Sequence, residues 1–207
     1  MFITLEGPEG SGKTTQMKKL AEALRVRGHA VFTTREPGGT SISDQIRRIL
    51  LDLGNEGMVP RTEILLFLAS RAQHTDEVIR PRLAIGEIVI CDRYRDSTVA
   101  YQGYGRGVDI GTLHGLNDFA TGGLLPDLTV LLDVSAETGL ARRASDGSWN
   151  RLDADAVEFH RRVRSGYHAM AEAEPDRWAV VDANQEVEAV QRALFKVVAA
   201  RLGVRGS

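Results

Sequence analysis

The sequence has 207 residues, of which 43% are hydrophobic and 26% are charged, and its formal net charge is −2. This length suffices for one domain with a full hydrophobic core, so we expect a single domain over residues 1–207. The lack of a basic excess disfavours a protein that binds DNA or RNA polymers. No apolar run approaches the length of a membrane span, so we expect no membrane partner. The single cysteine, Cys91, ends an apolar run and is expected to be buried; without a second cysteine no disulfide forms within the chain, which favours a cytoplasmic location.

Five short apolar runs have the composition of buried parallel strands, because they are rich in Val, Ile, Leu or Thr and lack regular alternation. They are Phe2 to Glu6, Ala30 to Arg35, Glu87 to Cys91, Leu128 to Asp133, and Trp178 to Asp182. Helical periodicity occurs in Lys13 to Arg27, Ile42 to Leu53, Ile64 to Ala84, Ala136 to Ala144, Asp155 to Ala173, and Val187 to Leu202. This alternation predicts an α/β fold, a doubly wound five-stranded parallel sheet with flanking helices, in which ligands bind at the carboxyl ends of the strands.

The first predicted strand leads into a glycine-rich segment and then into the first helix. This segment, GPEGSGKTT over residues 7–15, fits the P-loop pattern in the strand–loop–helix context that the pattern requires. Its glycines let backbone N–H groups turn towards phosphate oxygens, and the helix N-terminus favours negative charge. Lys13 is expected to reach the β- and γ-phosphates of ATP, and the Thr14 hydroxyl to ligate Mg²⁺. The predicted ATP-binding set is Gly7, Pro8, Glu9, Gly10, Ser11, Gly12, Lys13, Thr14 and Thr15.

The same cradle occurs in switch GTPases, which carry two further motifs, Asp-x-x-Gly after a strand and Asn-Lys-x-Asp for guanine. In this sequence no aspartate is followed by glycine three residues later, and no asparagine is followed by lysine. A guanine-nucleotide switch is therefore not expected.

Two later strands are also followed by charged groups suited to phosphate. Arg35 ends the second strand before a Pro-Gly-Gly turn, which indicates a second anion site, and the Glu36–Pro37 bond is a candidate for the cis form. Asp92 and Arg93 follow the third strand. If the first and third strands are neighbours, Asp92 lies beside the P-loop, where it suits Mg²⁺ directly or through water. Arg93 suits bidentate phosphate binding, although such a pair also occurs as a plain salt bridge.

Two segments between and after these strands carry groups suited to a nucleobase. Phe67 and Arg71 are four residues apart and share one helix face, where a ring would stack on a base and a guanidinium would bind its edge. Spacing alone favours a plainer interpretation, with Phe67 in the core and Arg71 solvated. Residues 97–107 are rich in glycine and are predicted to form a loop over a ligand, with Gln102 offering an amide and Tyr101 a flat wall.

Together these segments resemble the thymidylate kinase family. The matching segments follow the family order from Met1 to about Asp182: GPEGSGKTT, TREPGGT, LFLASR, DRY, STVAYQGYGRG, PDLTVLLDV and NRLD. TREPGGT, DRY and AYQG in combination are much more specific than the P-loop alone. The resemblance implies a P-loop kinase that makes dTDP from dTMP and ATP with Mg²⁺, and it implies a homodimer formed through helices.

The resemblance also implies roles for single residues. Arg35 and Arg93 would bind the acceptor phosphate, and Glu9 would lie near the sugar 3′-hydroxyl and the metal. Phe67 would hold the thymine, which reverses the plainer interpretation of this residue. The implied substrate-binding set is Glu9, Arg35, Phe67, Arg71, Arg93, Ser97, Tyr101 and Gln102, and the metal set is Thr14, Asp92 and Glu9.

Residues 141–153 are polar and basic, as expected of a mobile lid that excludes water during phosphoryl transfer. Some family members place a catalytic arginine inside the P-loop, but this chain has Glu9 and Gly10 there, like the bacterial type that supplies lid arginines. The candidates are Arg142, Arg143 and Arg151.

The implied chemistry needs no covalent enzyme intermediate, because an acceptor phosphate oxygen attacks the γ-phosphorus in line. Lys13, Arg93 and a lid arginine would offset the developing negative charge. Two alternatives stay open at this point. One is a kinase for another monophosphate, such as dUMP, UMP or dGMP; the other is a nucleotide-binding regulator without catalytic activity.

Overall fold

The computed structural model describes residues 1–145 and 150–203. The described residues form a sheet of five parallel strands in the order β2-β3-β1-β4-β5. The strands are β1 Phe2–Glu6, β2 Val31–Arg35, β3 Ile88–Asp92, β4 Leu128–Asp133 and β5 Trp178–Asp182. The helices are α1 Lys13–Val26, α2 Ser41–Leu51, α3 Pro60–His74, α4 Arg80–Ala84, α5 Arg95–Thr98, α6 Ile110–Thr121, α7 Ala136–Ser145, α8 Val157–Ala173 and α9 Val187–Leu202, with a short 3₁₀ turn η1 Leu53–Asn55 and the π-helical segments η2 Thr75–Ile79 and η3 Val99–Gly105. The predicted α/β fold with a five-stranded parallel sheet is confirmed.

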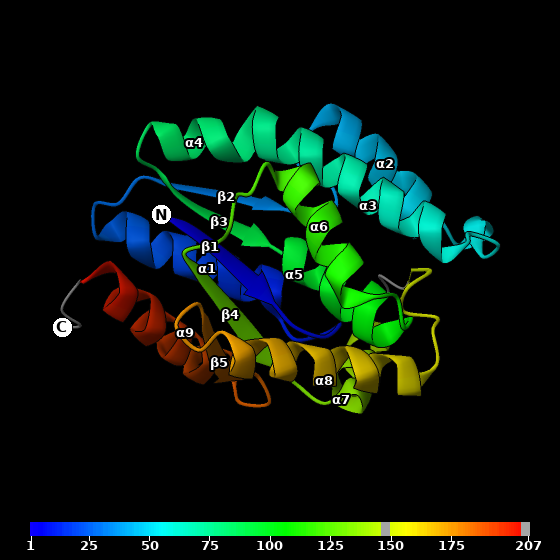
Figure 1. Cartoon of the computed structure of the whole chain (residues 1–207). Coiled ribbons are helices and arrows are strands. Elements are labelled where there is room, and N and C mark those ends of the chain that lie inside the picture. The colour runs from blue at the N-terminus through cyan, green and yellow to red at the C-terminus, as the bar shows by residue number, and fades with distance from the viewer. Residues whose placement is uncertain (146–149, 204–207) are drawn as a thin grey trace.

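Helices cover both faces of the sheet (Figure 1). On one face, α1 and α9 pack against each other and against the strands, and their side chains share one apolar cluster with Ile3, Leu5 and Ile90. Strand residues alternate in direction, so Phe2 and Val89 point to the other face, where they meet Ile79 at the end of η2. Burial on both faces explains why every residue of β1 and β3 is buried and why neither strand alternates regularly between apolar and polar residues.

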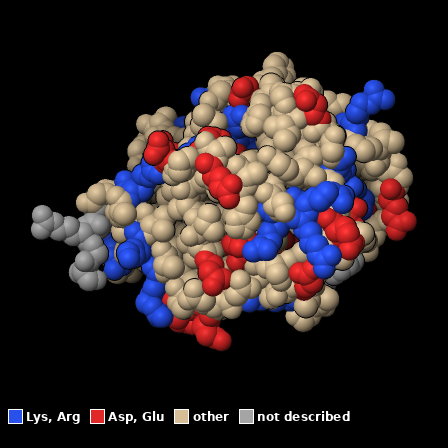
Figure 2. Space-filling model, turned by 60° about the horizontal axis from the view of Figure 1, so that its bottom comes forward, with Lys and Arg blue, Asp and Glu red and all other residues tan. Residues whose placement is uncertain are grey.

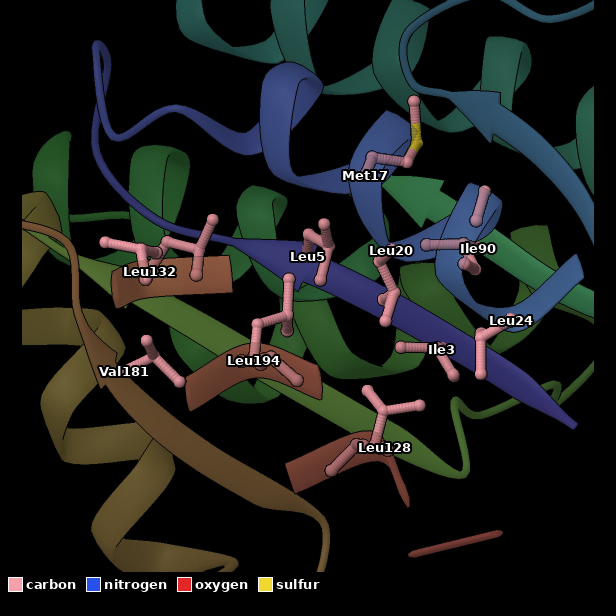
Figure 3. Close-up of a cluster of buried hydrophobic side chains, with 14 of the residues drawn as sticks. Ile3, Leu5, Met17, Leu20, Leu24, Ile90, Leu128, Leu132, Val181 and Leu194 are labelled. Atoms are coloured by element: carbon pink, nitrogen blue, oxygen red, sulfur yellow. The ribbon is translucent and has the colours of Figure 1, made fainter. Parts of the chain in front are cut away.

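The larger apolar cluster lies between the sheet and the α1–α9 layer. Figure 3 shows Leu20 and Leu24 of α1 and Leu194 of α9 directed at side chains of the central strands. Each of these three leucines is at most 1% exposed. Because this cluster holds β1 against α1, it fixes the position of the loop that joins them.

The charged surface has no single sign on the face shown in Figure 2, where basic and acidic side chains are interspersed. Within the described residues, no helix has both the length and the apolar character that crossing a membrane would require.

The segment 97–107 differs from the expected loop. It continues α5 as the π-helical segment η3, and most of its side chains are buried. Gly105 is needed here for close packing, because a Cβ at this position would lie 2.5 Å from a ring carbon of Phe159 on α8. The glycines that suggested a flexible loop instead let a helix lie close to its neighbour.

Two helices differ from the sequence prediction, one in its boundaries and one in not having been predicted. Helix α3 begins at Pro60, before the predicted start at Ile64, and continues through η2 into α4. Helix α6 was not predicted, although its ends carry ordinary signals: Asp109 caps its N-terminus by accepting a hydrogen bond from the Thr112 N–H, and Gly122 follows it in the left-handed conformation.

Candidate active site

A cavity of about 320 Å³ lies at the carboxyl ends of β1, β2 and β3. Most of the residues proposed from the sequence line it: Glu9, Gly10, Gly12, Lys13, Thr14, Thr15, Arg35, Phe67, Arg71, Asp92, Arg93, Ser97, Tyr101, Gln102, Arg142 and Arg143. Gly7, Pro8, Ser11 and Arg151 do not line it. The sheet order therefore brings segments from across the sequence into one cavity.

The P-loop joins β1 to α1 and curls around the side chain of Lys13. The Lys13 ammonium donates to the carbonyl oxygens of Gly7 and Pro8, at 3.1 and 2.8 Å, and to Ser11 Oγ at 3.1 Å. Burial lowers the pKa of Lys13 to about 8, and the nearby charge of Arg93 acts in the same direction. A bound polyphosphate would add negative charge beside Lys13, and so favour the protonated amine.

Oxygen ligands suited to a magnesium ion lie next to the P-loop. Because β3 pairs with β1, Asp92 stands beside α1, and Thr14 Oγ1 donates to Asp92 Oδ2 at 2.6 Å. The described residues hold no cluster of three or more His, Cys, Asp or Glu side chains suited to a metal. One hydroxyl and one carboxylate fit Mg²⁺, which usually takes its remaining ligands from water and substrate phosphates. The carboxylate of Glu9, also proposed as a ligand, instead accepts a hydrogen bond from Arg93.

Arg93 is the centre of a hydrogen-bond network beside the P-loop. Its guanidinium donates to Gly7 O at 3.0 Å, to Ser97 Oγ at 3.2 Å and to Glu9 Oε1 at 2.8 Å. It also donates to the hydroxyls of Tyr167 and Tyr101, at 3.1 and 3.0 Å. These five contacts hold a rigid fork against the P-loop, the geometry that binds phosphate oxygens well.

The backbone at Arg93 is strained. Its φ is +70°, and it is the one non-glycine residue with positive φ within residues 1–145 and 150–203. For an ordinary side chain this conformation costs about 1–2 kcal/mol. The network around the guanidinium offsets that cost, and the turn directs the side chain from the end of β3 back towards the P-loop.

Glu9 and Tyr101 complete the wall around Arg93. Burial opposes ionisation of Glu9, but the charges of Arg93 and Lys13 outweigh it and lower the pKa of Glu9 to about 2. The Tyr101 hydroxyl donates to Glu9 Oε1 at 2.9 Å, and burial raises the pKa of Tyr101 well above its ordinary value. Glu9 is therefore an ionised acceptor at neutral pH, and Tyr101 is a neutral donor.

A buried carboxylate, Glu6, lies behind this network at the end of β1. It accepts hydrogen bonds from the backbone N–H of Tyr94 at 2.8 Å, from Ser97 Oγ at 2.6 Å and from the Tyr167 hydroxyl at 3.0 Å. Ser97 and Tyr167 are also partners of Arg93. Glu6 was not singled out from the sequence, because it appears there only as the last residue of an apolar strand.

The pH dependence of stability should report on Glu6. Burial raises its pKa from 4.5 to about 7, the charge of Asp96 adds to this, and the charge of Arg93 opposes it. The folded state thus holds a proton that the unfolded state has lost, so stability is lost as pH rises from 4.5 through about 7. We expect wild type to lose on the order of 3 kcal/mol relative to Glu6→Gln over this range, measured by urea unfolding at a series of pH values. If the difference in unfolding free energy between wild type and Glu6→Gln stays constant with pH, the raised pKa of Glu6 is contradicted.

Residues of α3 and of the α5–η3 segment line another part of the cavity. Phe67 lines the cavity from α3. Arg71 is 2% exposed rather than solvated, and its guanidinium donates to Glu36 Oε2, Thr98 Oγ1 and Asn117 Oδ1, each at 2.8 Å. The plainer interpretation of Arg71 is therefore wrong, because buried hydrogen-bond acceptors surround it.

Arginines also gather where β2 ends. The Glu36–Pro37 bond is cis, and Arg35 lines the cavity with a half-exposed side chain that contacts Asp44 at 3.3 Å. Arg47 of α2 lines the cavity too and donates to Pro37 O at 2.8 Å. Sequence reasoning missed Arg47, because the pattern of α2 identified only its apolar face.

Helix α7 brings two lid candidates to the cavity. Gly139 packs so closely against Glu9 and Gly10 of the P-loop that a Cβ on either glycine would collide with the facing backbone. One turn later, Arg142 donates to Ala183 O at 3.0 Å, and Arg143 contacts Asp153 at 3.2 Å. Residues 146–149 of the predicted lid lie outside the described residues.

Arg151, the third lid candidate, is held elsewhere. It is 8% exposed and donates to Glu63 Oε2 at 2.6 Å and to Leu50 O at 2.9 Å. Asn150 and Leu152, which the sequence did not single out, also line the cavity.

Comparison with known proteins agrees with this arrangement. The family model for thymidylate kinase matches residues 5–194. The thymidylate kinase of Roseiflexus castenholzii is 52% identical, over 96% of this chain and 92% of that protein. The thymidylate kinase of Thermomicrobium roseum is 54% identical, over 95% of this chain and 93% of that protein. The crystal structure of thymidylate kinase from Ehrlichia chaffeensis superposes with a TM-score of 0.79 at 38% identity, covering 96% and 97% of the two chains. The chain therefore belongs to the thymidylate kinase family.

Proposed function

We propose that this chain, acting as one kinase domain, transfers the γ-phosphoryl group of Mg-ATP to dTMP and yields dTDP and ADP. The observation that carries the proposal is one cavity lined by most of the P-loop, including Lys13, and by Arg93 and Phe67, which suit an acceptor nucleotide. A donor site without an acceptor site would suit a nucleotide-binding regulator. The presence of both halves in one cavity favours a transferase.

The reaction is an in-line displacement at the γ-phosphorus. An oxygen of the acceptor phosphate forms a bond to phosphorus as the bond to the β–γ bridging oxygen breaks, and ADP leaves. Lys13 contacts the β- and γ-phosphates, and Arg93 orients the acceptor phosphate. Thr14 and Asp92 would hold Mg²⁺, which would neutralise part of the negative charge on the phosphates. Ionised Glu9 lies beside Arg93, where it is suited to accept a hydrogen bond from the sugar 3′-hydroxyl.

The acceptor specificity can be tested with a panel of nucleoside monophosphates. We expect dTMP to be the best substrate in an assay of coupled ADP release, dUMP to be poorer by the roughly tenfold or more that one methyl group provides, and UMP and dGMP to be poor. Tyr101 would crowd a ribose 2′-hydroxyl, and a pyrimidine would stack on Phe67. Tyr101→Phe keeps the ring and should keep sugar selectivity. UMP or dGMP turning over as well as dTMP would refute the thymidylate assignment and leave only a general kinase.

The lid arginines are proposed to contact the transferring phosphoryl group. Arg142 and Arg143 lie on the cavity wall, whereas Arg151 contacts Glu63. We expect Arg142→Ala or Arg143→Ala to lower kcat by about tenfold or more with a smaller change in KM for dTMP. Arg151→Ala is expected to lower Tm more than the other two. Normal kcat in all three variants would exclude the lid model.

The working unit is proposed to be a homodimer in the cytoplasm. Leu65 on α3 and Phe119 on α6 are 61% and 90% exposed, and these two helices pack together. Large exposed apolar side chains on neighbouring helices favour association with a second copy. Mass measurement by light scattering tests this, with Phe119→Glu expected to weaken the dimer. The free thiol of Cys91 is buried, which suits a reducing compartment.

A further inference from the structure

One carboxylate outside the predicted site connects the base side of the cavity with two arginines. Glu63 of α3 is 1% exposed. It accepts hydrogen bonds from Gln102 Nε2 at 2.9 Å, from Arg106 Nε at 2.8 Å and from Arg151 Nη2 at 2.6 Å. Three segments far apart in the sequence therefore meet at this one side chain.

Two hydrogen bonds join α3 to the α5–η3 segment, and they lie eight residues apart along α3 and four residues apart along α5–η3. Arg71 donates to Thr98 Oγ1 at 2.8 Å, and Gln102 donates to Glu63 at 2.9 Å. Phe67 lies midway between Arg71 and Glu63 on the same face of α3 and lines the cavity. A base stacked on Phe67 would therefore have Arg71 towards one end of its edge and Gln102 towards the other.

The charge state of Glu63 determines which way the Gln102 amide points. Burial opposes ionisation, but hydrogen bonds from Arg106, Gln102 and Arg151 lower the pKa of Glu63 below its ordinary value. An ionised carboxylate only accepts hydrogen bonds, so Gln102 must turn its NH₂ group towards it. Within the described residues the side-chain carbonyl oxygen of Gln102 has no hydrogen-bond partner. This oxygen is not completely buried. Gln102 lines the cavity, so this oxygen is available to a ligand there.

We propose that Glu63 is a positioning residue that sets the base selectivity of the site, by holding the Gln102 amide with its carbonyl oxygen towards the base. This inference rests on the proposed function. A carbonyl acceptor matches the ring N3–H of thymine or uracil, whereas cytosine has an acceptor at N3 and leaves two acceptors facing each other. The arginines that contact Glu63 act indirectly, because they keep it ionised.

The test is a double-mutant cycle read as the ratio of kcat/KM for dTMP to kcat/KM for dCMP. In Glu63→Gln the new amide both accepts and donates, so Gln102 is free to turn either way. We expect the ratio to fall by about tenfold or more, since a site that matches a hydrogen-bonding group discriminates strongly against its mismatch. Gln102→Met should lower the ratio similarly, and adding Glu63→Gln to it should change the ratio by less than about twofold.

Asp96→Asn serves as the matched control. Asp96 is another buried carboxylate, held by Arg177 at 2.6 Å, and it does not line the cavity. The Asp96→Asn substitution should lower Tm and leave the dTMP-to-dCMP ratio of kcat/KM unchanged. If Glu63→Gln does not fold, Glu63→Asp takes its place in the cycle, because its carboxylate keeps the charge opposite the arginines but is one methylene too short to hold the Gln102 amide. The ratio should then fall in Glu63→Asp as well.

Two outcomes would overturn the inference: a wild-type ratio in the Glu63 variant, or effects of the Glu63 and Gln102 substitutions that multiply in the double variant. Failure of the proposed function is distinguishable. It appears as absence of dTMP-dependent ADP release in the wild-type chain, whereas an active wild type with an unchanged ratio in Glu63→Gln contradicts only the role of Glu63.

Discussion

Lys13→Ala is expected to reduce kcat by about 10²–10³ while the protein stays folded. Lys13 is 7% exposed, and its ammonium donates hydrogen bonds to three oxygens of the P-loop. Removing it deletes a preorganised charge where negative charge develops during transfer. It also removes the cost of burying that charge, so Tm should change little.

The measurement is single-turnover kinetics together with thermal unfolding. Lys19→Ala is the matched control, because Lys19 lies on the same helix with a side chain that is 42% exposed and forms an ion pair with Glu188. It should retain wild-type turnover. A Lys13→Ala enzyme with wild-type kcat would show that this loop is not the donor site.

Arg93→Lys should be the second most damaging change. Lysine keeps the positive charge but loses the planar fork, so it cannot reach all five acceptors that surround Arg93. We expect kcat/KM for dTMP to fall by about 10²-fold, because the acceptor phosphate loses a bidentate partner. Stability should also fall by about 1–3 kcal/mol, since the hydroxyls of Tyr101 and Tyr167 lose a buried partner.

The control for this change is Arg95→Lys, two residues along the chain. The Arg95 side chain contacts Asp118 at 2.8 Å, and the Asp118 carboxylate is largely exposed. Kinetics with dTMP varied at saturating ATP, and with ATP varied at saturating dTMP, should show the loss in Arg93→Lys mainly on the dTMP side. If kcat/KM falls equally for dTMP and for ATP, Arg93 supports the structure of the site and does not bind the acceptor phosphate.

Local sequence patterns predicted the elements that depend on local chemistry. The P-loop could be located because its glycines, Lys13 and Thr14 are adjacent in the chain and their roles follow from backbone geometry. The parallel strands could be located because strands covered on both faces must be apolar throughout. Segment 97–107 could not be predicted in the same way, because Gly105 serves a contact with Phe159, which is 54 residues away in the chain (159 − 105).

By itself, the sequence determined the class of fold, the donor loop and, through its resemblance to a family, the candidate acceptor residues. Only the tertiary structure decided which of these groups lie together. Glu6 and Glu63 look like ordinary residues of a strand and a helix, yet each accepts hydrogen bonds from residues at least 39 positions away. The physical reason is that a buried carboxylate must find its partners in space, and the packing of the sheet and helices, rather than the local pattern, supplies them.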